Sequence, residues 1–155
     1  MKRVRDDGYE VDDDRARIDL ARAHRWIAED GYWARGMPFD LFKRSVEGAR
    51  CFGIYAPDGA QVGFARVISD GATFGYIGDV FVDPAHRGKA LSKYLMTAIM
   101  AHPELQGFRR WMLVTADAHA LYKQFGFEAL ANPERVMERR HPDPYGQSIG
   151  NSNGA

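Results

Sequence analysis

The stretch 79–92 constrains the fold of this chain more than any other part of the sequence. Aromatic and β-branched residues dominate positions 75–82, which predicts a buried strand, and a helix with one apolar face is expected over about 87–101. A strand, a glycine-containing turn and a helix start expose several unpaired backbone N–H groups at the positive end of a helix dipole. With Arg87 and Lys89 in the turn, the sequence predicts a site for a ligand that carries more than one phosphate.

The spacing Arg87-x-x-Ala90-x-Ser92 resembles the acyl-coenzyme A pyrophosphate signature of the GNAT family of N-acetyltransferases, which reads Gln/Arg-x-x-Gly-x-Gly/Ala. The family prefers glycine at the positions of Ala90 and Ser92. We expect a methyl or hydroxymethyl group to be tolerated there at helical backbone angles. Without the resemblance, a solvated basic helix start after a strand explains the same residues.

A second signature lies further along the chain. In the GNAT family a strand is followed by a helix that ends in Leu-Tyr-x-x-x-Gly-Phe, and the sequence matches this at Leu121, Tyr122, Gly126 and Phe127. The two signatures occur in the order of the family fold, and the resemblance covers roughly residues 9–140. It implies an α/β (α+β) fold of the GNAT acyl-CoA N-acyltransferase type, with a mixed central sheet of six or seven strands and helices on both faces.

Chain length predicts a single domain. The 155 residues are enough for one hydrophobic core, and we expect the domain to occupy residues 1–140. The tail over 141–155 is polar and contains Pro142 and Pro144, so we expect it to lack core contacts of its own. Docking of this tail on a partner chain would give a homodimer.

Charge and cysteine content exclude several classes of function. Lysine plus arginine and aspartate plus glutamate both number 21, and this balance argues against a nucleic-acid partner. The single cysteine, Cys51, allows no intramolecular disulfide and no thiolate zinc cluster, and the histidines lack metal-ligand spacing. No apolar run reaches membrane-spanning length, and the N-terminus is charged where a signal peptide is apolar. We therefore expect a cytoplasmic protein that binds no metal, membrane or nucleic acid.

Hydrophobic periodicity and turn residues predict the other elements. A first helix is expected from Ile18 to a stop at Gly31, and a second from Pro38 to about Gly48. A turn at 57–59 predicts a hairpin. The expected strands are 51–55, 61–69, 75–82, 111–115, 127–130 and 136–139, with a short helix over 118–125.

The resemblance implies acetyl-coenzyme A as the co-substrate. The strand at 75–82 would splay from the strand at 111–115, and the pantetheine arm would enter the gap. Backbone groups of Val80, Phe81 and Val82 would hold the pantetheine amides and polarise the acetyl carbonyl. The pyrophosphate would be bound by the N–H groups of Arg87, Gly88, Lys89, Ala90, Leu91 and Ser92. Thr115 stands where many relatives have a cofactor-positioning asparagine, and its hydroxyl could make one of those hydrogen bonds.

Tyr122 is the candidate general acid. A phenol with a pKa near 10 can protonate a thiolate whose conjugate acid has a pKa near 8.5, because the transfer is only mildly uphill. The alternative is a core tyrosine on the apolar face of its helix. The motif favours the catalytic interpretation.

The candidate general base is Asp79. It lies in an otherwise apolar strand, where an unpaired carboxylate is costly, so it needs either a partner or a function. Asp117 and His119, beside the helix of Tyr122, are the alternatives, and His119 has an ordinary pKa near neutrality.

The acceptor is expected to be a primary amine of a small molecule or peptide. Candidate acceptor-binding residues are Tyr32, Trp33, Arg35, Arg66 and His119. Tyr32 and Trp33, in a loop flanked by glycines, can equally be packed against the core. A competing function is a non-catalytic module of the same fold that binds acyl-coenzyme A and acts through a protein partner.

Overall fold

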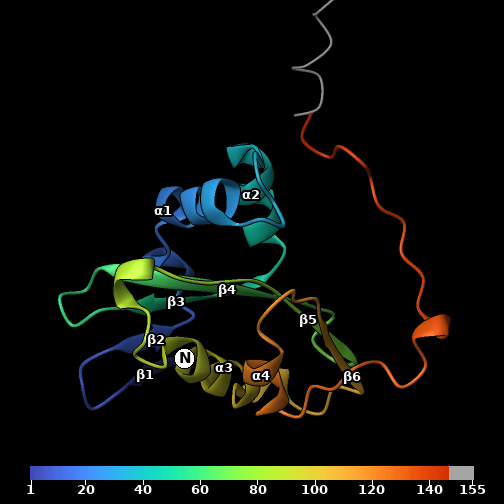
Figure 1. The fold of residues 1–155 in the computed structure, drawn as a ribbon. Helices are drawn as coiled ribbons and strands as arrows, with labels where there is room; N and C mark the ends of the chain where they lie inside the picture. The colour runs from blue at the N-terminus through green and yellow to red at the C-terminus, as the bar shows by residue number, and fades with distance from the viewer. Residues whose placement is uncertain (147–155) are drawn as a thin grey trace, which may run out of the picture.

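The computed structural model describes residues 1–146, which form a six-stranded mixed sheet with helices on both faces (Figure 1). The strands lie in sequence order: β1 (Lys2–Val4), β2 (Glu10–Asp12), β3 (Arg50–Tyr55), β4 (Gln61–Ser69), β5 (Phe74–Val82) and β6 (Arg110–Leu113). Neighbouring strands are antiparallel, except that β5 and β6 are parallel. The fold class expected from the sequence is confirmed.

Two layers of helices cover the sheet (Figure 1). One face carries α1 (Leu20–Arg25), its π-helical continuation η2 (Trp26–Asp30) and α2 (Phe39–Glu47), and the other carries α3 (Leu91–Met100) and α4 (His119–Lys123). The short 3-10 helices are η1 (Arg15–Arg17), η3 (Pro84–His86), η4 (Pro103–Leu105) and η5 (Pro133–Arg135). Within residues 1–146, no helix is long and apolar enough to cross a membrane.

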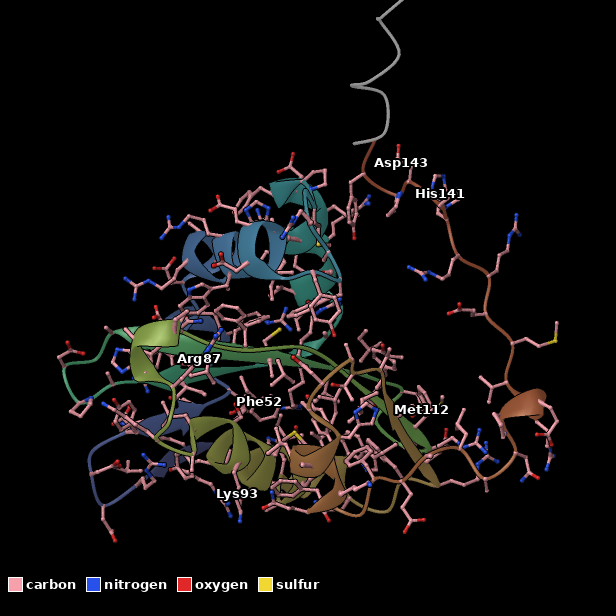
Figure 2. All side chains as sticks on the ribbon, viewed as in Figure 1. Phe52, Arg87, Lys93, Met112, His141 and Asp143 are labelled. Atoms are coloured by element: carbon pink, nitrogen blue, oxygen red, sulfur yellow. The ribbon has the colours of Figure 1, made fainter. Side chains whose placement is uncertain are left out.

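Each face of the sheet has its own hydrophobic core. Phe42 of α2 packs with Phe64 of β4 on one face, and Phe52 of β3 packs with Leu95 of α3 on the other. Figure 2 labels Phe52. All four side chains are fully buried. At roughly 2 to 3 kcal/mol for each buried large apolar side chain, these two cores hold the helices on the sheet.

The two N-terminal helices form where the sequence predicts them. The Asp19 side chain caps α1 by accepting a hydrogen bond from the Arg22 N–H at 2.9 Å. Gly31 follows η2, and Pro38 precedes the first residue of α2. The π-helical turn of η2 was not predicted, because the periodicity of α1 continues through it.

The strand pairing of β5 changes along its length. Its first half, Phe74–Ile77, pairs in parallel with Arg110–Leu113 of β6. The pairing ends at Ile77, so within the described residues the second half, Gly78–Val82, has only β4 as a neighbour. The predicted splay between these two strands is therefore confirmed.

The helix after β5 begins later than expected. Asp83 caps η3, and α3 starts only at Leu91, after a turn in which Gly88 has φ +77°. Ala90 has φ +55°, a left-handed conformation. The expectation of helical backbone angles at Ala90 is wrong, because the chain must reverse direction between the 3-10 turn and the helix. The glycine preferred by the family at this position has no Cβ to oppose that conformation.

The C-terminal region also differs from the expectation. Residues 127–130 and 136–139 form no strand pair, because neither segment meets a partner strand among the described residues. Every residue from 128 to 142 is exposed. The predicted lack of core contacts in the tail is wrong for Tyr145, which is partly buried against the core beneath α1 and α2. The rest of the tail, 147–155, lies outside the described residues.

Candidate active site

The free half of β5 forms the centre of the candidate site. Gly78–Val82 hydrogen-bonds to β4 on one side only, so the backbone groups on its other side are open to a ligand. Phe81 and Val82 are buried, whereas Val80 is half-buried and packs against the core on the α3 side. An open strand edge with apolar side chains can bind an extended chain that carries amide groups, such as pantetheine.

A bulge in β5 changes the direction of the Asp79 side chain beside this edge. The register between β4 and β5 shifts between Phe64 and Arg66, and Asp79 has φ +55°. Aspartate tolerates the left-handed region better than most residues. The bulge places the carboxylate of Asp79 beside Arg66 and the loop between η2 and α2.

Asp79 is buried and paired. Its Oδ2 accepts a charged hydrogen bond from Arg66 Nε, and its Oδ1 accepts a hydrogen bond from Trp33 Nε1 at 2.8 Å. The side chains of Arg66 and Asp79 are 17% and 5% exposed. The sequence argument required either a partner or a function for this carboxylate, and the structure supplies two partners. The two hydrogen bonds also connect Asp79, Arg66 and Trp33, which the sequence analysis named as separate candidates.

Tyr32 links this cluster to the segment that follows β6. Its ring meets Trp33 edge to face, with 5.2 Å between centroids, and its Oη accepts a hydrogen bond from the Ala116 N–H at 3.1 Å. The side chains of Tyr32 and Trp33 are 60% and 42% exposed. They are therefore not simply packed into the core, and they remain available to an acceptor.

Tyr122 of α4 is buried among apolar residues, and its ring packs edge-on against Phe127 at 6.0 Å. Its Oη makes no hydrogen bond to another residue within 1–146. Burial raises the pKa of Tyr122, and the neighbouring Tyr32 and Asp117 add to the rise. Tyr122 therefore stays protonated at neutral pH, which is the state that a proton donor needs.

Thr115 and His119 are less closely tied to this cluster. The Thr115 hydroxyl accepts a hydrogen bond from the Ala118 N–H at 3.0 Å and so closes the turn that precedes α4. His119 is exposed at the first position of α4. Neither side chain is bonded to Asp79, Arg66 or Tyr122.

The turn between β5 and α3 is exposed from Arg87 to Ala90 and anchored in the core by the buried Leu91. Arg87 Nε donates to the Val82 carbonyl at 3.1 Å, and its guanidinium lies 5.5 Å from the centroid of the Phe81 ring. Arg87 thus braces the end of β5. The first N–H groups of a helix have no acceptor within the helix, so the start of α3, which includes Ser92, can bind an anion.

Three residues that the sequence analysis missed support this turn. Lys89 Nζ donates to Tyr9 Oη at 2.9 Å, and Tyr9 Oη is hydrogen-bonded to His86 Nδ1 at 2.8 Å. Arg5 Nη1 donates to the Lys89 carbonyl at 2.9 Å. Tyr9 and Arg5 come from the N-terminal hairpin, far away in sequence, and no local pattern signals this contact.

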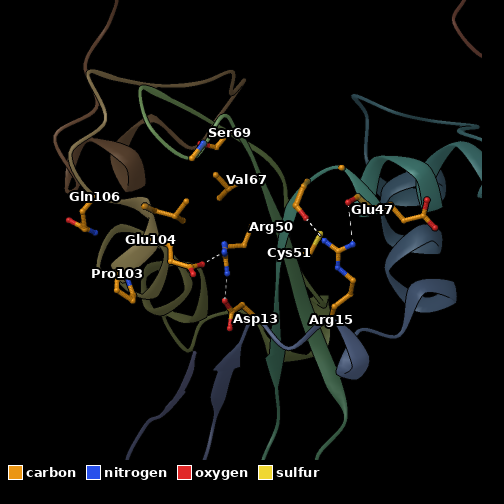
Figure 3. Close-up of a pocket in the computed structure, with 14 residues that line it drawn as sticks. Asp13, Arg15, Glu47, Arg50, Cys51, Val67, Ser69, Pro103, Glu104 and Gln106 are labelled. Carbon is orange, nitrogen blue, oxygen red and sulfur yellow. Dashed lines mark hydrogen bonds and ion pairs between the residues drawn. The ribbon is translucent and has the colours of Figure 1, made fainter.

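A cavity of about 900 Å³ lies at the opposite end of the sheet (Figure 3). Arg50 extends into it and is paired with Asp13 and Glu104, while Arg15 donates to the carbonyls of Glu47 and Ala49. The two guanidiniums are thus bound within the protein. Size alone does not make this cavity the reactive site, since the nominated residues lie elsewhere.

A parallel strand pair that separates beside a glycine-containing helix start is the architecture of an acyltransferase. A family model described as the acetyltransferase (GNAT) family matches residues 16–127. The chain belongs to the GNAT family, as its two signatures indicated.

Relatives support the same assignment. A solved structure from Xanthomonas campestris pv. campestris, of a protein assigned to the GNAT family, is 48% identical, with 89% of this chain and 96% of that chain covered and a TM-score of 0.85. A Gibberella zeae protein classed by name with the acetyltransferases is 29% identical, with 77% of this chain and 79% of the relative covered. Glucosamine-6-phosphate N-acetyltransferase from Arabidopsis thaliana shares the fold alone, at 17% identity, 87% and 99% coverage and a TM-score of 0.60.

Proposed function

We propose that this chain transfers the acetyl group of acetyl-coenzyme A to a primary amine of a small molecule or peptide. The observation that carries the proposal is the free edge of β5 beside the start of α3, where Gly78–Val82 has β4 as its only neighbouring strand within residues 1–146. Family membership supports acetyl transfer in general.

The residues present fit acetyl-coenzyme A. The open edge offers N–H and C=O groups for the amides of a pantetheine arm, and the exposed turn offers N–H groups for a pyrophosphate. A Cβ atom added at Gly88 would meet no other atom within 4 Å, so the space around this turn is open. Lys89 adds a positive charge that the Tyr9 hydroxyl holds in place.

The reaction forms a C–N bond and breaks a C–S bond, while the amine loses a proton and the thiolate gains one. Backbone N–H groups near Val80 would polarise the carbonyl as it gains negative charge. Tyr122 would donate the proton to the departing sulfur, because its hydroxyl is protonated at neutral pH.

We propose that Asp79, or a water molecule bound to it, accepts the proton that the amine loses. Arg66 and Trp33 each occupy one carboxylate oxygen, but each oxygen has a second lone pair that can accept a hydrogen bond. The same two contacts hold Trp33 and Arg66 beside the site, so Asp79 would also position the acceptor wall formed by Tyr32 and Trp33.

The test is release of coenzyme A thiol in the presence of a panel of primary amines, with Tyr122→Phe as the variant. We expect the kcat of the variant to fall on the order of 100-fold, a typical contribution of general acid catalysis, while the affinity for acetyl-coenzyme A changes little. Tyr55→Phe is the matched control, because it removes a hydroxyl group from another buried tyrosine, one whose Oη is itself buried and lacks a hydrogen-bond partner within the described residues. Full activity of the Tyr122 variant would contradict the assigned role.

The second candidate function is an acyl-coenzyme A-binding module without catalysis. The left-handed Ala90, which places a methyl group where the family prefers glycine, favours it. In that case acetyl-coenzyme A would bind, no amine would cause thiol release, and Tyr122→Phe would change nothing measurable.

A further inference from the structure

The guanidinium of Arg66 is only partly used by its contact with Asp79. Its Nε donates to Asp79 Oδ2, and no other hydrogen bond or ion pair of Arg66 occurs among residues 1–146. The Nη1 and Nη2 groups therefore keep all of their N–H donors free. The side chain is nevertheless only 17% exposed, so the surrounding protein holds this fork of donors in one place.

Both Nη atoms of Arg66 can be reached by a ligand. Within residues 1–146, the buried side-chain nitrogen and oxygen atoms without a hydrogen-bond partner are Tyr55 Oη and Tyr94 Oη. The Nη atoms of Arg66 also lack a partner but are not among these buried atoms, so they lie at the protein surface. A planar fork of N–H donors binds an anion such as a carboxylate through two parallel hydrogen bonds.

The surroundings of this fork are apolar and aromatic. Arg66 pairs with Cys51 of β3, which belongs to the core beneath α1 and α2, so the fork lies on that face of the sheet. Ile68, two residues further along β4, is 40% exposed and pairs with Tyr76 of β5. Burial raises the pKa of Tyr76, Asp79 raises it further and Arg66 opposes the rise, so Tyr76 lies close to both charges. A ligand on Arg66 would therefore contact little else that is charged.

Arg66 and Asp79 together offer two opposite charges at one point. Asp79 can still accept a hydrogen bond from an ammonium or amine, and Arg66 can donate to an anion. A simple amine would bring a positive charge next to the guanidinium with nothing to offset the repulsion. A ligand that carries an amine and a carboxylate side by side would match both charges.

We propose that the acetyl acceptor is a free α-amino acid, whose carboxylate is bound by Nη1 and Nη2 of Arg66 and whose amine is held by Asp79. The amine and carboxylate of an α-amino acid are attached to the same carbon, and the two groups that would bind them are in direct contact. A peptide N-terminus fits less well, because its α-carbon carries a neutral amide instead. This assignment rests on the proposed function and names its substrate class.

The transfer balances as before. The α-amine nitrogen bonds to the acetyl carbon while the C–S bond breaks, the amine proton passes to Asp79, and the sulfur takes the proton of Tyr122. Trp33, which donates to Asp79, also lines a cavity of about 390 Å³ with Tyr32, Arg35 and residues 140–145. This cavity would give room to the side chain of the amino acid.

The first test compares ligands on the wild-type protein. L-Phenylalanine, L-phenylalaninamide and 2-phenylethylamine have the same ring and a primary amine, and they differ in the group on the α-carbon. Calorimetry with and without coenzyme A measures their binding, and thiol release from acetyl-coenzyme A measures turnover. Matched sets built on L-leucine and L-glutamate extend the test to other side chains.

In at least one set, the amino acid should bind at least 10-fold more tightly than its amide and its decarboxylated amine. Its kcat/KM should exceed theirs by at least the same factor. No preference for the carboxylate in any set, or no binding of any of these ligands, would overturn the proposal.

Arg66→Lys tests the fork itself, because lysine keeps a positive charge beside Asp79 but has no planar pair of donors. We expect the KM for the preferred amino acid to rise at least 10-fold with little change in kcat, since the carboxylate is bound in the ground state and the transition state alike. The kcat/KM for the decarboxylated amine and the affinity for acetyl-coenzyme A should stay near the wild-type values. Arg44→Gln, which removes an exposed arginine of α2, is the matched control and should change none of these. Equal losses for the amino acid and the amine in Arg66→Lys would overturn the role of the fork.

The α-amino acid and the acetyl transfer can fail separately. Binding that depends on the carboxylate and on Arg66, without thiol release, would support the amino-acid site and contradict the proposed function. Thiol release that is equally fast with the decarboxylated amines would overturn the amino-acid assignment and leave acetyl transfer to amines in place.

Discussion

Two nearly buried aspartates, Asp13 and Asp79, sit at different places on the sheet and have different surroundings. Oδ1 of Asp13 is paired with the Met1 ammonium group. Its Oδ2 is paired with Arg50 at 2.9 Å and with His102 at 2.8 Å. Its partners come from three separate parts of the chain, so this carboxylate ties the fold together.

Among the described residues, Asp79 has Arg66 and Trp33 as its side-chain partners, and both lie beside the free half of β5. Trp33 is partly exposed, as is the neighbouring Tyr32. The comparison shows that burial of a charge does not by itself indicate function. What distinguishes Asp79 is an open strand edge within reach and aromatic side chains that remain accessible.

Asp13→Ala should produce the largest effect, and that effect should be on stability. The substitution leaves the positive groups of Arg50 and Met1 without their common partner, and removing one member of a buried charge cluster costs roughly 3 kcal/mol. Urea denaturation measures the unfolding free energy. Turnover per folded molecule should stay near the wild-type value, and a selective loss of turnover would contradict the structural role of Asp13.

Asp79→Asn should lower activity more than it lowers stability. The amide oxygen can still accept from Trp33, but the charge that faces Arg66 is lost. We expect kcat/KM for the amine to fall about 10-fold or more, which corresponds to about 1.4 kcal/mol of transition-state stabilisation. Steady-state kinetics at saturating acetyl-coenzyme A measure it. If stability fell as far as in Asp13→Ala while kcat/KM held, the contrast between the two aspartates would be wrong.

Ala90→Gly should have a smaller effect. Glycine removes the Cβ that opposes φ +55°, which should raise the unfolding free energy by roughly 0.5 to 1 kcal/mol. Ser92→Gly is the matched control, because Ser92 lies inside α3, where glycine lowers stability by about 0.5 kcal/mol. The midpoint of thermal unfolding should rise in Ala90→Gly and fall in Ser92→Gly. A loss of stability in Ala90→Gly would contradict the left-handed turn.

The Asp13 cluster also predicts a pH dependence of stability. Burial lowers the pKa of His102 below its ordinary 6.5, and Arg50 and the Met1 ammonium lower it further, against the opposite influence of Glu104. The Glu104 N–H donates to Nδ1 of His102, so the neutral ring donates through Nε2 to Asp13.

The sign follows from linkage. The unfolded chain takes up a proton on His102 near pH 6.5, before the folded protein does, so acidification favours unfolding. The contribution of His102 is present above about pH 6.5 and is lost as the pH falls toward the lower folded-state pKa. Urea denaturation between pH 8 and pH 5 should show a shallower decline in His102→Gln than in the wild type. Parallel declines would contradict the assignment.

Local patterns in the sequence predicted the elements and the residues that lie on them. The hairpin of β3 and β4, the helix starts near Asp19 and Pro38, and the splay of β5 from β6 all follow from periodicity, turn residues and the family signatures. Tyr32, Trp33, Arg66 and Asp79 were nominated one by one, and the structure brings them together.

Features that depend on contacts between distant segments were not predicted. Nothing near Lys89 in the sequence indicates that Tyr9 and Arg5 will support it. The left-handed conformation of Ala90 arises from a chain reversal that helical periodicity does not encode. The last two strands were predicted from residues that favour strands, but strand formation also requires a neighbouring strand, and residues 1–146 supply none for these two segments.

The most direct test of the central claim, that the turn before α3 and the free edge of β5 bind acetyl-coenzyme A, is calorimetric titration of the wild type, Gly88→Val and Gly107→Val. Both glycines have left-handed φ, +77° and +75°, and open space around them, so the two variants carry the same backbone strain. We predict micromolar binding by the wild type and Gly107→Val, and at least 10-fold weaker binding by Gly88→Val. Equal binding by all three proteins, or none at millimolar ligand, would contradict the claim.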